Sequence, residues 1–336
     1  MFSAENGPQI FFIGVAGLFV VASGVWVFRD SRARLGRRSS EAWMWAVGTL
    51  VLPFLVLPFY LVVSRPPGGV MRCPSCGRAT LSHRAVCRHC ERPIPFDSPP
   101  SMWGLGEIIG ISIVFGLTLP LIAGSVGVGG TPEFAEFSSY AVLQSVLLAV
   151  LSLYVVRRRY HQPAQLLGVR SDRAAARAGA GVLLGGAMVF ISTQVEAGAI
   201  ALVGAVVGRA EAQRMAEAEH MRNPVTEVLI SGVTPAELLW ILVLLCVVVP
   251  VAEEIFFRGL VFRGLRARWG ALTAALASAV FFGAVHLELV HFLPIFVLGV
   301  VLAYTVERTQ SLVPAIVIHG VNNVVAVLTT LYHWNI

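Results

Sequence analysis

The chain has 336 residues; 56% of them are hydrophobic, only 13% are charged, and the formal net charge is +6. Soluble globular domains carry about 25% charged residues, so this composition excludes a soluble globular protein. The basic residues lie beside apolar runs, as in the cytoplasmic loops of membrane proteins, and this placement argues against a nucleic-acid partner. The clusters are Arg29–Arg38, Arg157–Arg159, Arg170–Arg177 and Arg258–Arg268.

Nine apolar runs follow one another along the chain, most of them close to the ~20 residues that cross about 30 Å of hydrocarbon. They are 10–28, 42–63, 102–124, 138–156, 178–207, 237–257, 270–286, 291–306 and 311–332. Because no water satisfies backbone groups inside a bilayer, each run must be helical. We therefore predict an all-α, multi-pass protein of the cell membrane, a bundle of about eight to nine transmembrane helices surrounded by the lipid bilayer.

The N-terminal part raises a question of topology. The run 10–28 is expected to be a retained helix, because the nine residues before it contain no Lys or Arg and it is longer than the apolar core of a signal peptide. The second run contains Pro53 and Pro58, which make it kinked or re-entrant. If the segment 64–100 is cytoplasmic, the loop 29–41 with its five arginines would face outward. Either this loop violates the positive-inside rule, or the second run does not fully cross.

Two Cys-x-x-Cys pairs, Cys73–Cys76 and Cys87–Cys90, lie between the second and third runs and are separated by ten residues. Two such pairs can close a tetrahedral four-sulfur site around zinc. A segment this short buries little core, so metal binding would supply most of its folding energy. Two disulfides or four unrelated thiols are the alternatives, although cytoplasmic thiols stay reduced.

We therefore expect a small zinc-ribbon insert with a structural Zn²⁺ held by Cys73, Cys76, Cys87 and Cys90. The insert resembles the zinc ribbons at the termini of many membrane proteins. That resemblance is equally consistent with recruitment of a protein partner and with structural anchoring.

The segment 208–236 is polar and rich in Ala, Glu, Gln and Arg, so we expect an outward-facing loop that holds a short surface helix. A short loop at the membrane surface also explains Glu288 and His291. Glu196 either lines a cavity or marks an outer helix end. We assign none of these three residues to a catalytic site.

Ionisable residues in the last four runs carry more information. Glu253 and Glu254 are adjacent in an apolar helix, where a charge costs several kcal/mol unless it finds polar partners. Glu254 and Arg258 are four residues apart and can pair on one helix face, whereas Glu253 points roughly 100° away. The alternative is a helix end at the membrane interface, where Glu and Arg reach into the headgroups.

Two further runs add histidines. Phe282 and His286 are one helical turn apart, and His319 and Asn323 share a helix face. A lone histidine in a membrane helix is usually a packing residue, but three polar elements on three otherwise apolar helices are harder to explain by packing. A carboxylate can take a proton from water, imidazoles can position that water or a metal, and an amide can hold a developing oxyanion. Together these groups provide what peptide hydrolysis needs.

The motifs Glu253-Glu254-x-x-x-Arg258, Phe282-x-x-x-His286 and His319-x-x-x-Asn323, in this order, resemble those of the CAAX-prenyl-protease and bacteriocin-processing family of intramembrane proteases. The stretch 305–314 is also similar to that family. The resemblance covers roughly residues 101–332. It implies an intramembrane endopeptidase whose substrates are peptides or membrane proteins.

The resemblance also implies roles for single residues. Glu253 would be the general base that activates water, assisted by His286. His319 and Asn323 would bind the oxyanion, and Glu254 with Arg258 would orient the site. We expect no obligatory metal, but a glutamate and two histidines could also form a catalytic zinc site with an open position.

We divide the chain into an N-terminal transmembrane hairpin (1–64), a zinc ribbon with its linker (65–100) and an intramembrane protease core (101–336).

Two functions other than proteolysis are also consistent with buried ionisable residues. A proton-coupled transporter would show inverted repeats, which we do not find in the sequence. A catalytically inactive membrane scaffold could keep the motif residues for stability and recruit a partner through the ribbon.

Overall fold

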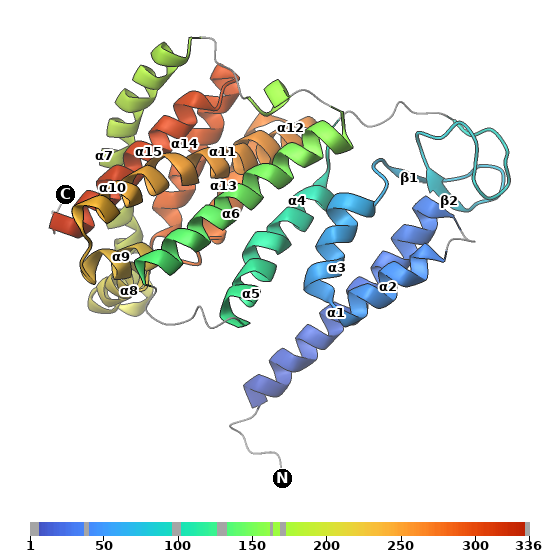
Figure 1. Cartoon of the computed structure of the whole chain (residues 1–336), viewed down its shortest axis with the longest axis horizontal. Coiled ribbons are helices and arrows are strands. Elements are labelled where there is room, and N and C mark those ends of the chain that lie inside the picture. The colour runs from blue at the N-terminus through green and yellow to red at the C-terminus, as the bar shows by residue number, and fades with distance from the viewer. Residues whose placement is uncertain are drawn as a thin grey trace. The chain divides into compact units, whose positions relative to one another are not determined.

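The computed structural model describes residues 7–36, 40–95, 102–125, 133–161, 164–168 and 173–332. The chain folds into two compact units, Met1–Thr118 and Leu119–Ile336. Within the described ranges, seven helical segments are long and apolar enough to cross a membrane, which confirms the all-α, multi-pass class (Figure 1). They are Gly14–Leu35, Leu105–Ile122, Phe134–Arg159, Ala174–Val207, Pro235–Trp269, Phe292–Thr309 and Val313–Tyr332; Pro53–Ser64 and Ala271–Ala284 are shorter apolar helices.

The first unit contains helices and one small sheet. Its elements are α1 (Gly7–Leu35), α2 (Glu41–Val51), α3 (Pro53–Phe59) with a π-helical end (Tyr60–Ser64), β1 (Val70–Arg72), β2 (Ala79–Leu81), and α4 (Leu105–Ile113) with a π-helical end (Val114–Thr118). The two strands pair antiparallel, Val70 with Leu81 and Arg72 with Ala79.

The second apolar run is broken into α2 and α3. Its first and last residues both lie near the C-terminal end of α1. The ring of Trp43, near the start of α2, lies 4.4 Å from that of Phe28. Arg65, which follows the π-helical end of α3, lies 2.8 Å from Asp30, only two residues beyond Phe28. At 1.5 Å per residue, α2 is about 17 Å long and the segment Pro53–Ser64 about 18 Å, and both are too short for about 30 Å of hydrocarbon.

The break occurs at Leu52, whose φ of −132° and ψ of 65° leave the helical region immediately before Pro53. Between the arms the rings of Trp45 and Tyr60 lie 5.7 Å apart, as expected for an antiparallel helical hairpin. The second run is therefore re-entrant and does not fully cross. Arg29, Arg32 and Arg34 at the end of α1 consequently lie on the same side as the cysteine segment, as the positive-inside rule expects.

A buried charge network holds the base of this hairpin. Asp30 accepts hydrogen bonds from Arg34 Nε (2.9 Å), Arg65 Nε (2.8 Å) and the Tyr60 hydroxyl (2.7 Å). Arg34 also donates Nη1 to the carbonyls of Pro66 and Gly68, over 2.7 and 2.8 Å. A low-polarity site favours such pairing because an unpaired charge there would be costly.

The second unit is a helical bundle. Its elements are α5 (Leu119–Ser125), α6 (Phe134–Tyr154) with a π-helical end (Val155–Arg159), a 3₁₀ turn (Ala164–Leu167), α7 (Ala174–Val207), α8 (Arg209–Met221), α9 (Pro224–Ile230), α10 (Pro235–Val243), η6 (Leu244–Val248), α11 (Val249–Glu254), η7 (Ile255–Phe262), α12 (Arg263–Trp269), α13 (Ala271–Ala284), α14 (Phe292–Thr309) and α15 (Val313–Tyr332). The polar segment 208–236 holds α8 and α9, so the predicted surface helix is confirmed.

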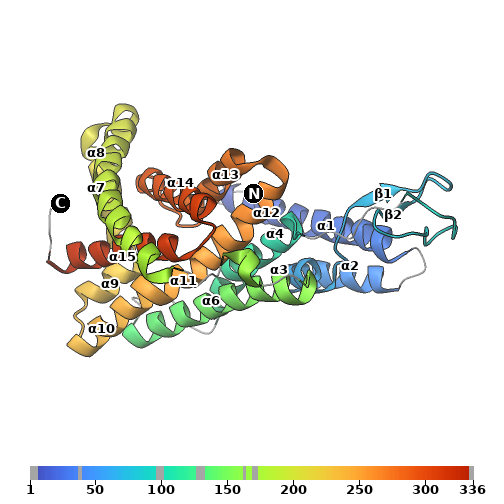
Figure 2. The same cartoon turned by 90° about the horizontal axis from the view of Figure 1, so that it is seen from above.

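Small residues allow the helices of this unit to approach closely. A Cβ on Gly185 of α7 would lie 2.8 Å from Val321 of α15, so α7 and α15 pack at short range (Figures 1 and 2). Gly299 of α14 packs against Ala279 of α13 in the same way. Without a hydrophobic driving force between helices in lipid, such close packing is the main source of association.

Replacing Asp30 by Ala should destabilise the re-entrant hairpin, because three donors lose their acceptor. Removing one partner of a buried ion pair typically costs about 3–5 kcal/mol. We expect about 3 kcal/mol, measured as the shift in unfolding when SDS is titrated into micelles of the purified protein. The control is Glu41→Ala, an exposed first-turn residue of α2 for which less than about 1 kcal/mol is expected. Equal shifts for the two variants would contradict the proposed role of the network.

Candidate active site

The helix that carries both glutamates is irregular on either side of them. Pro250 has no backbone N–H, and ahead of it the helix widens into η6, where Val249 donates to the carbonyl of Leu244 five residues back. A second π-helical segment, η7, begins directly after Glu254. Glu253 and Glu254 therefore occupy one short α-helical stretch between two π-helical segments, which are frequent at functional sites.

Glu254 is the centre of a buried ion network. Its Oε1 accepts a hydrogen bond from Arg258 Nη1 over 2.9 Å and lies 3.0 Å from His319 Nδ1. The side chains of Glu254 and Arg258 are both 0% exposed. Because an ionised carboxylate can only accept, Nδ1 of His319 carries a hydrogen and Nε2 points away from Glu254. The predicted Glu254–Arg258 pair is thus present, and it also orients His319.

Glu253 differs from its neighbour in exposure. Its side chain is 24% exposed, whereas that of Glu254 is fully buried. Glu253 Oε2 lies 3.8 Å from Nε2 of His319, so the two imidazole nitrogens face the two glutamates. Glu253 is therefore the carboxylate that a water molecule can reach.

Phe282 of α13 holds the remaining groups in place. Its ring stands edge-on to both imidazoles, with centroids 4.9 Å from His286 and 5.7 Å from His319. The guanidinium of Arg258 lies 4.3 Å above the same ring, a cation–π contact. His286 is exposed, and its Nδ1 lies 2.7 Å from the carbonyl of Phe282. Since a carbonyl only accepts, Nδ1 carries a hydrogen, and in the neutral imidazole Nε2 is then the nitrogen that can accept a proton.

Asn323 contacts the helix of the glutamates rather than their side chains. Its Nδ2 donates to the carbonyl of Leu245 over 2.7 Å. This is the carbonyl that a π-helical N–H at position 250 would have bound, had that residue not been proline. Gly320 lies against the next carbonyl, that of Cys246, so closely that a Cβ would overlap the oxygen. The glycine at position 320 therefore allows α15 to pack closely against the glutamate helix.

The structure thus gathers five of the six predicted side chains around Phe282 and Glu254, while Asn323 lies one turn from His319 and binds the backbone. Asn322 points elsewhere and donates to Ile318 of its own helix over 2.8 Å. The sequence analysis gave no role to the ring of Phe282 or to Ser278. Ser278 donates to the carbonyl of Phe257 over 3.1 Å, and the carbonyl of Gly299 accepts from Arg258 Nη2 over 3.2 Å. Backbone partners of this kind leave no sequence signal.

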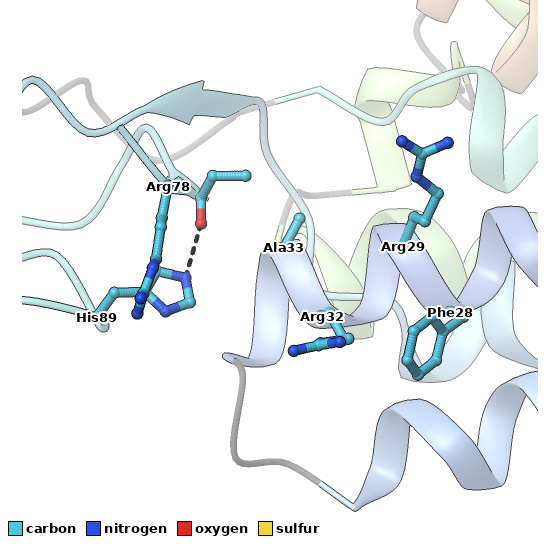
Figure 3. A pocket seen from close by; sticks show the side chains of 7 residues that line it. Phe28, Arg29, Arg32, Ala33, Arg78 and His89 are labelled. Atoms are coloured by element: carbon cyan, nitrogen blue, oxygen red, sulfur yellow. Dashed lines mark hydrogen bonds between the residues drawn. The ribbon is translucent and has the colours of Figure 1, made fainter. Parts of the chain in front are cut away.

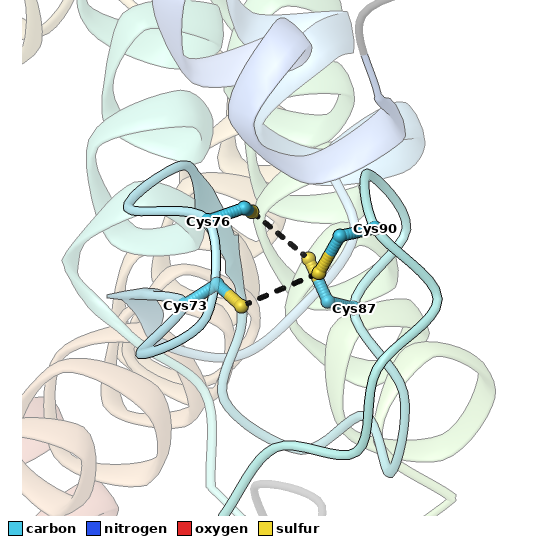
Figure 4. A group of neighbouring side chains, drawn as sticks. All are labelled: Cys73, Cys76, Cys87 and Cys90. Atoms are coloured by element: carbon cyan, nitrogen blue, oxygen red, sulfur yellow. Dashed lines mark hydrogen bonds between the residues drawn. The ribbon is translucent and has the colours of Figure 1, made fainter.

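Metal-binding geometry is present in the first unit. Within the described ranges, the one group of three or more His, Cys, Asp or Glu side chains that could hold a metal ion is the four cysteines, whose sulfurs lie within 4.8 Å of one another. Cys73 Sγ is 3.8 Å from Cys90 Sγ, and Cys76 Sγ is 3.8 Å from Cys87 Sγ (Figure 4). A tetrahedral thiolate site with metal–sulfur bonds of about 2.3 Å has sulfurs about 3.8 Å apart, so these four residues could hold a metal ion.

The two cysteine pairs sit on equivalent turns. Cys73 N donates to Arg78 O over 2.8 Å, and Cys87 N donates to Arg92 O over 3.0 Å. The residue after each second cysteine has a positive φ, 68° at Gly77 and 59° at Glu91. Each turn therefore presents its sulfurs to the centre through the same backbone conformation.

A basic pocket lies between the end of α1 and the cysteine turns (Figure 3). Arg29, Arg32, Arg78 and His89 are among its lining residues, and His89 Nε2 lies 2.9 Å from the carbonyl of Ala79. This basic lining agrees with the side of the membrane on which loops carry an excess of Lys and Arg.

A second polar cluster follows His286. His291 lies 3.0 Å from Glu219 of α8, 3.4 Å from Glu196 of α7 and 3.8 Å from Glu288. The hydrogen bond to Glu196, together with these nearby carboxylates, raises the pKa of His291 to about 9. A surface loop alone does not account for this set, because it joins three separate elements.

Residues 235–325 match the family described as Type II CAAX prenyl endopeptidase Rce1-like. The match confirms the resemblance drawn from the motifs and covers all six predicted catalytic residues. No curated protein and no solved structure is detectably similar to the chain. Residues 235–325 of this membrane protein are therefore similar to a family of CAAX-type endopeptidases.

The pKa of His291 predicts how stability changes with pH. Its folded value of about 9 lies above the ordinary 6.5, so folding favours the protonated form. This contribution is fully present below about pH 6.5 and is lost as the pH rises through about 9. The thermal unfolding temperature of wild type minus that of His291→Gln should be largest at or below pH 6.5 and fall towards zero above pH 9. A difference that grows with pH would contradict the assigned ion pairs.

Proposed function

We propose that the chain is an intramembrane endopeptidase that cleaves membrane-associated peptides or proteins with a water molecule activated by Glu253. The observation that carries the proposal is the contrast between two adjacent glutamates. One is fully buried and paired with Arg258 and His319, and the other is partly exposed beside Nε2 of that same histidine. Two adjacent carboxylates in different environments can take different chemical roles.

In this mechanism Glu253, assisted by His286 Nε2, takes a proton from water as its oxygen attacks the scissile carbonyl carbon. The tetrahedral intermediate carries a negative oxygen, which the protonated Nε2 of His319 can bind. Glu254 supports the charge on His319, much as a carboxylate supports an imidazolium in other hydrolases. When the intermediate collapses, the C–N bond breaks and Glu253 returns its proton to the leaving amine.

Asn323 can assist at the same oxygen. A primary amide has two N–H donors, and in the structure one of them is bound to the carbonyl of Leu245. We assign the second to the developing oxyanion. Asn323 would then link the position of the glutamate helix to the position of the reacting carbonyl.

A metal is assigned to the ribbon and not to the reaction. We propose that Cys73, Cys76, Cys87 and Cys90 hold one structural Zn²⁺, which suits four thiolates in tetrahedral arrangement. The division into a hairpin, a ribbon and a protease core, with the ribbon as a docking point for a protein partner, belongs to the same proposal.

Glu253→Gln keeps the size of the side chain but removes the base, so kcat should fall by at least about 10³-fold. The measurement is cleavage of a fluorogenic membrane peptide by purified protein in detergent, with folding checked by circular dichroism. Glu217→Gln, an exposed residue of α8, is the control and should keep wild-type turnover. Wild-type cleavage by Glu253→Gln would remove the basis for the mechanism and leave the scaffold or transporter functions.

Asn323→Ala should lower kcat by about 10²–10³-fold with little change in KM, because the charge it binds develops only in the transition state. Asn322→Ala is the matched control on the neighbouring position, since its amide bonds only to its own helix. A greater loss in Asn322→Ala would show that the other face of α15 lines the reaction site.

Elemental analysis should find one zinc per chain in the purified protein. Replacing both Cys76 and Cys90 by Ser should release it, whereas Cys246→Ser, the cysteine outside the ribbon, should retain it. Full zinc content in the double variant would show that the metal is bound at a site other than the four cysteines, and it would favour a metalloprotease mechanism.

A further inference from the structure

A carboxylate from outside the membrane core anchors the segment that follows His286. Glu219 of α8 accepts hydrogen bonds from three consecutive backbone N–H groups, those of Leu289 (2.7 Å), Val290 (3.0 Å) and His291 (3.2 Å). The chain separation is 70 residues or more. Successive N–H groups directed at one point form a natural anion site. Although burial opposes ionisation, these hydrogen bonds lower the pKa of Glu219.

The same carboxylate is tied to two further elements. Glu219 is 9% exposed, and its Oε2 lies 3.0 Å from Nδ1 of His291. The opposite nitrogen of His291 lies 3.4 Å from Glu196 of α7. A protonated His291 between two carboxylates therefore fastens α7, α8 and the start of α14 together.

Little else holds the backbone between His286 and His291. The regular part of α13 ends at Ala284, and Leu287 has a positive φ of 58°. The amides of His286 and Leu287 make only long single-turn bonds, of 3.3 and 3.2 Å. The side chains of Leu287 and Leu289 are 92% and 63% exposed, and Val290 is buried. The hydrogen bonds to Glu219 are accordingly the principal polar restraint on this segment.

We propose that Glu219 is a positioning residue for hydrolysis: by binding the amides of residues 289–291, it sets the place of the His286 imidazole relative to Glu253. This inference rests on the proposed function. His286 itself is held from the other side by its bond to the carbonyl of Phe282. The contact with Phe282 restrains the imidazole from the preceding helical turn, and the hydrogen bonds of Glu219 restrain the backbone that follows His286. Without Glu219 the second restraint is lost. An error of about 1 Å in such a group can cost on the order of 10²-fold in rate.

The test compares wild type with Glu219→Ala and with Glu217→Ala, an exposed glutamate two residues away on the same helix. Three quantities are measured on full-length protein in the same detergent. They are hydrogen exchange of the amides of residues 289–291, the NMR signal of the His286 imidazole (assigned with His286→Gln), and kcat and KM for the fluorogenic peptide.

Glu219→Ala should speed the exchange of these amides, shift the His286 signal and lower kcat by about 10–100-fold with KM little changed. Glu217→Ala should match wild type in all three. If Glu219→Ala fails to fold, Glu219→Gln, which keeps the size and one acceptor oxygen, replaces it with the same expectations at smaller amplitude.

Faster exchange with an unmoved His286 signal and wild-type kcat would overturn the inference and leave Glu219 as a structural anchor. Unchanged exchange would overturn it as well. If wild type cleaves nothing, the proposed function fails separately, and the His286 signal alone decides whether Glu219 positions that residue.

Discussion

One buried carboxylate, Glu254, imposes the arrangement of the second unit. An ion in a medium that solvates charge poorly must be neutralised at short range, and Glu254 meets this need with Arg258 on its own helix and His319 on α15. Arg258 in turn reaches the backbone of α14 and lies over Phe282 of α13. The charge on Glu254 thus fixes the relative positions of the glutamate helix, α13, α14 and α15. A shift of any of these helices would leave an ion without its partner.

The glutamate helix can serve this network because it is not a regular helix. Pro250 leaves backbone carbonyls without their usual donors, and α15 supplies the replacement through Asn323 while Gly320 allows the necessary approach to Cys246. His319 and Asn323 therefore contact the same partner helix in different ways: His319 contacts the Glu254 side chain, and Asn323 binds the backbone carbonyl of Leu245. Packing and chemistry therefore both constrain the spacing of the same few residues.

Much of this arrangement is predictable from the chain alone, because hydrophobicity and helical periodicity are local. The number of apolar runs, the pairing of Glu254 with Arg258 and the cysteine turns follow from residues a few positions apart. The local sequence could not predict that the second run turns back towards Asp30, since a proline permits both a kink and a reversal of the chain. Glu219 could not be found either: it is one of several glutamates on a polar helix, and only the fold reveals which one meets the amides after His286.

The re-entrant hairpin also has a consequence for how such a protein can be built. A segment that leaves the membrane on the side where it entered contributes nothing to the count of crossings. Residues 41–95, hairpin and ribbon together, could then be gained or lost between α1 and α4 without inverting any helix downstream. A module of this kind changes the surface that the protein presents beside the membrane, while the topology of the helices that follow stays the same.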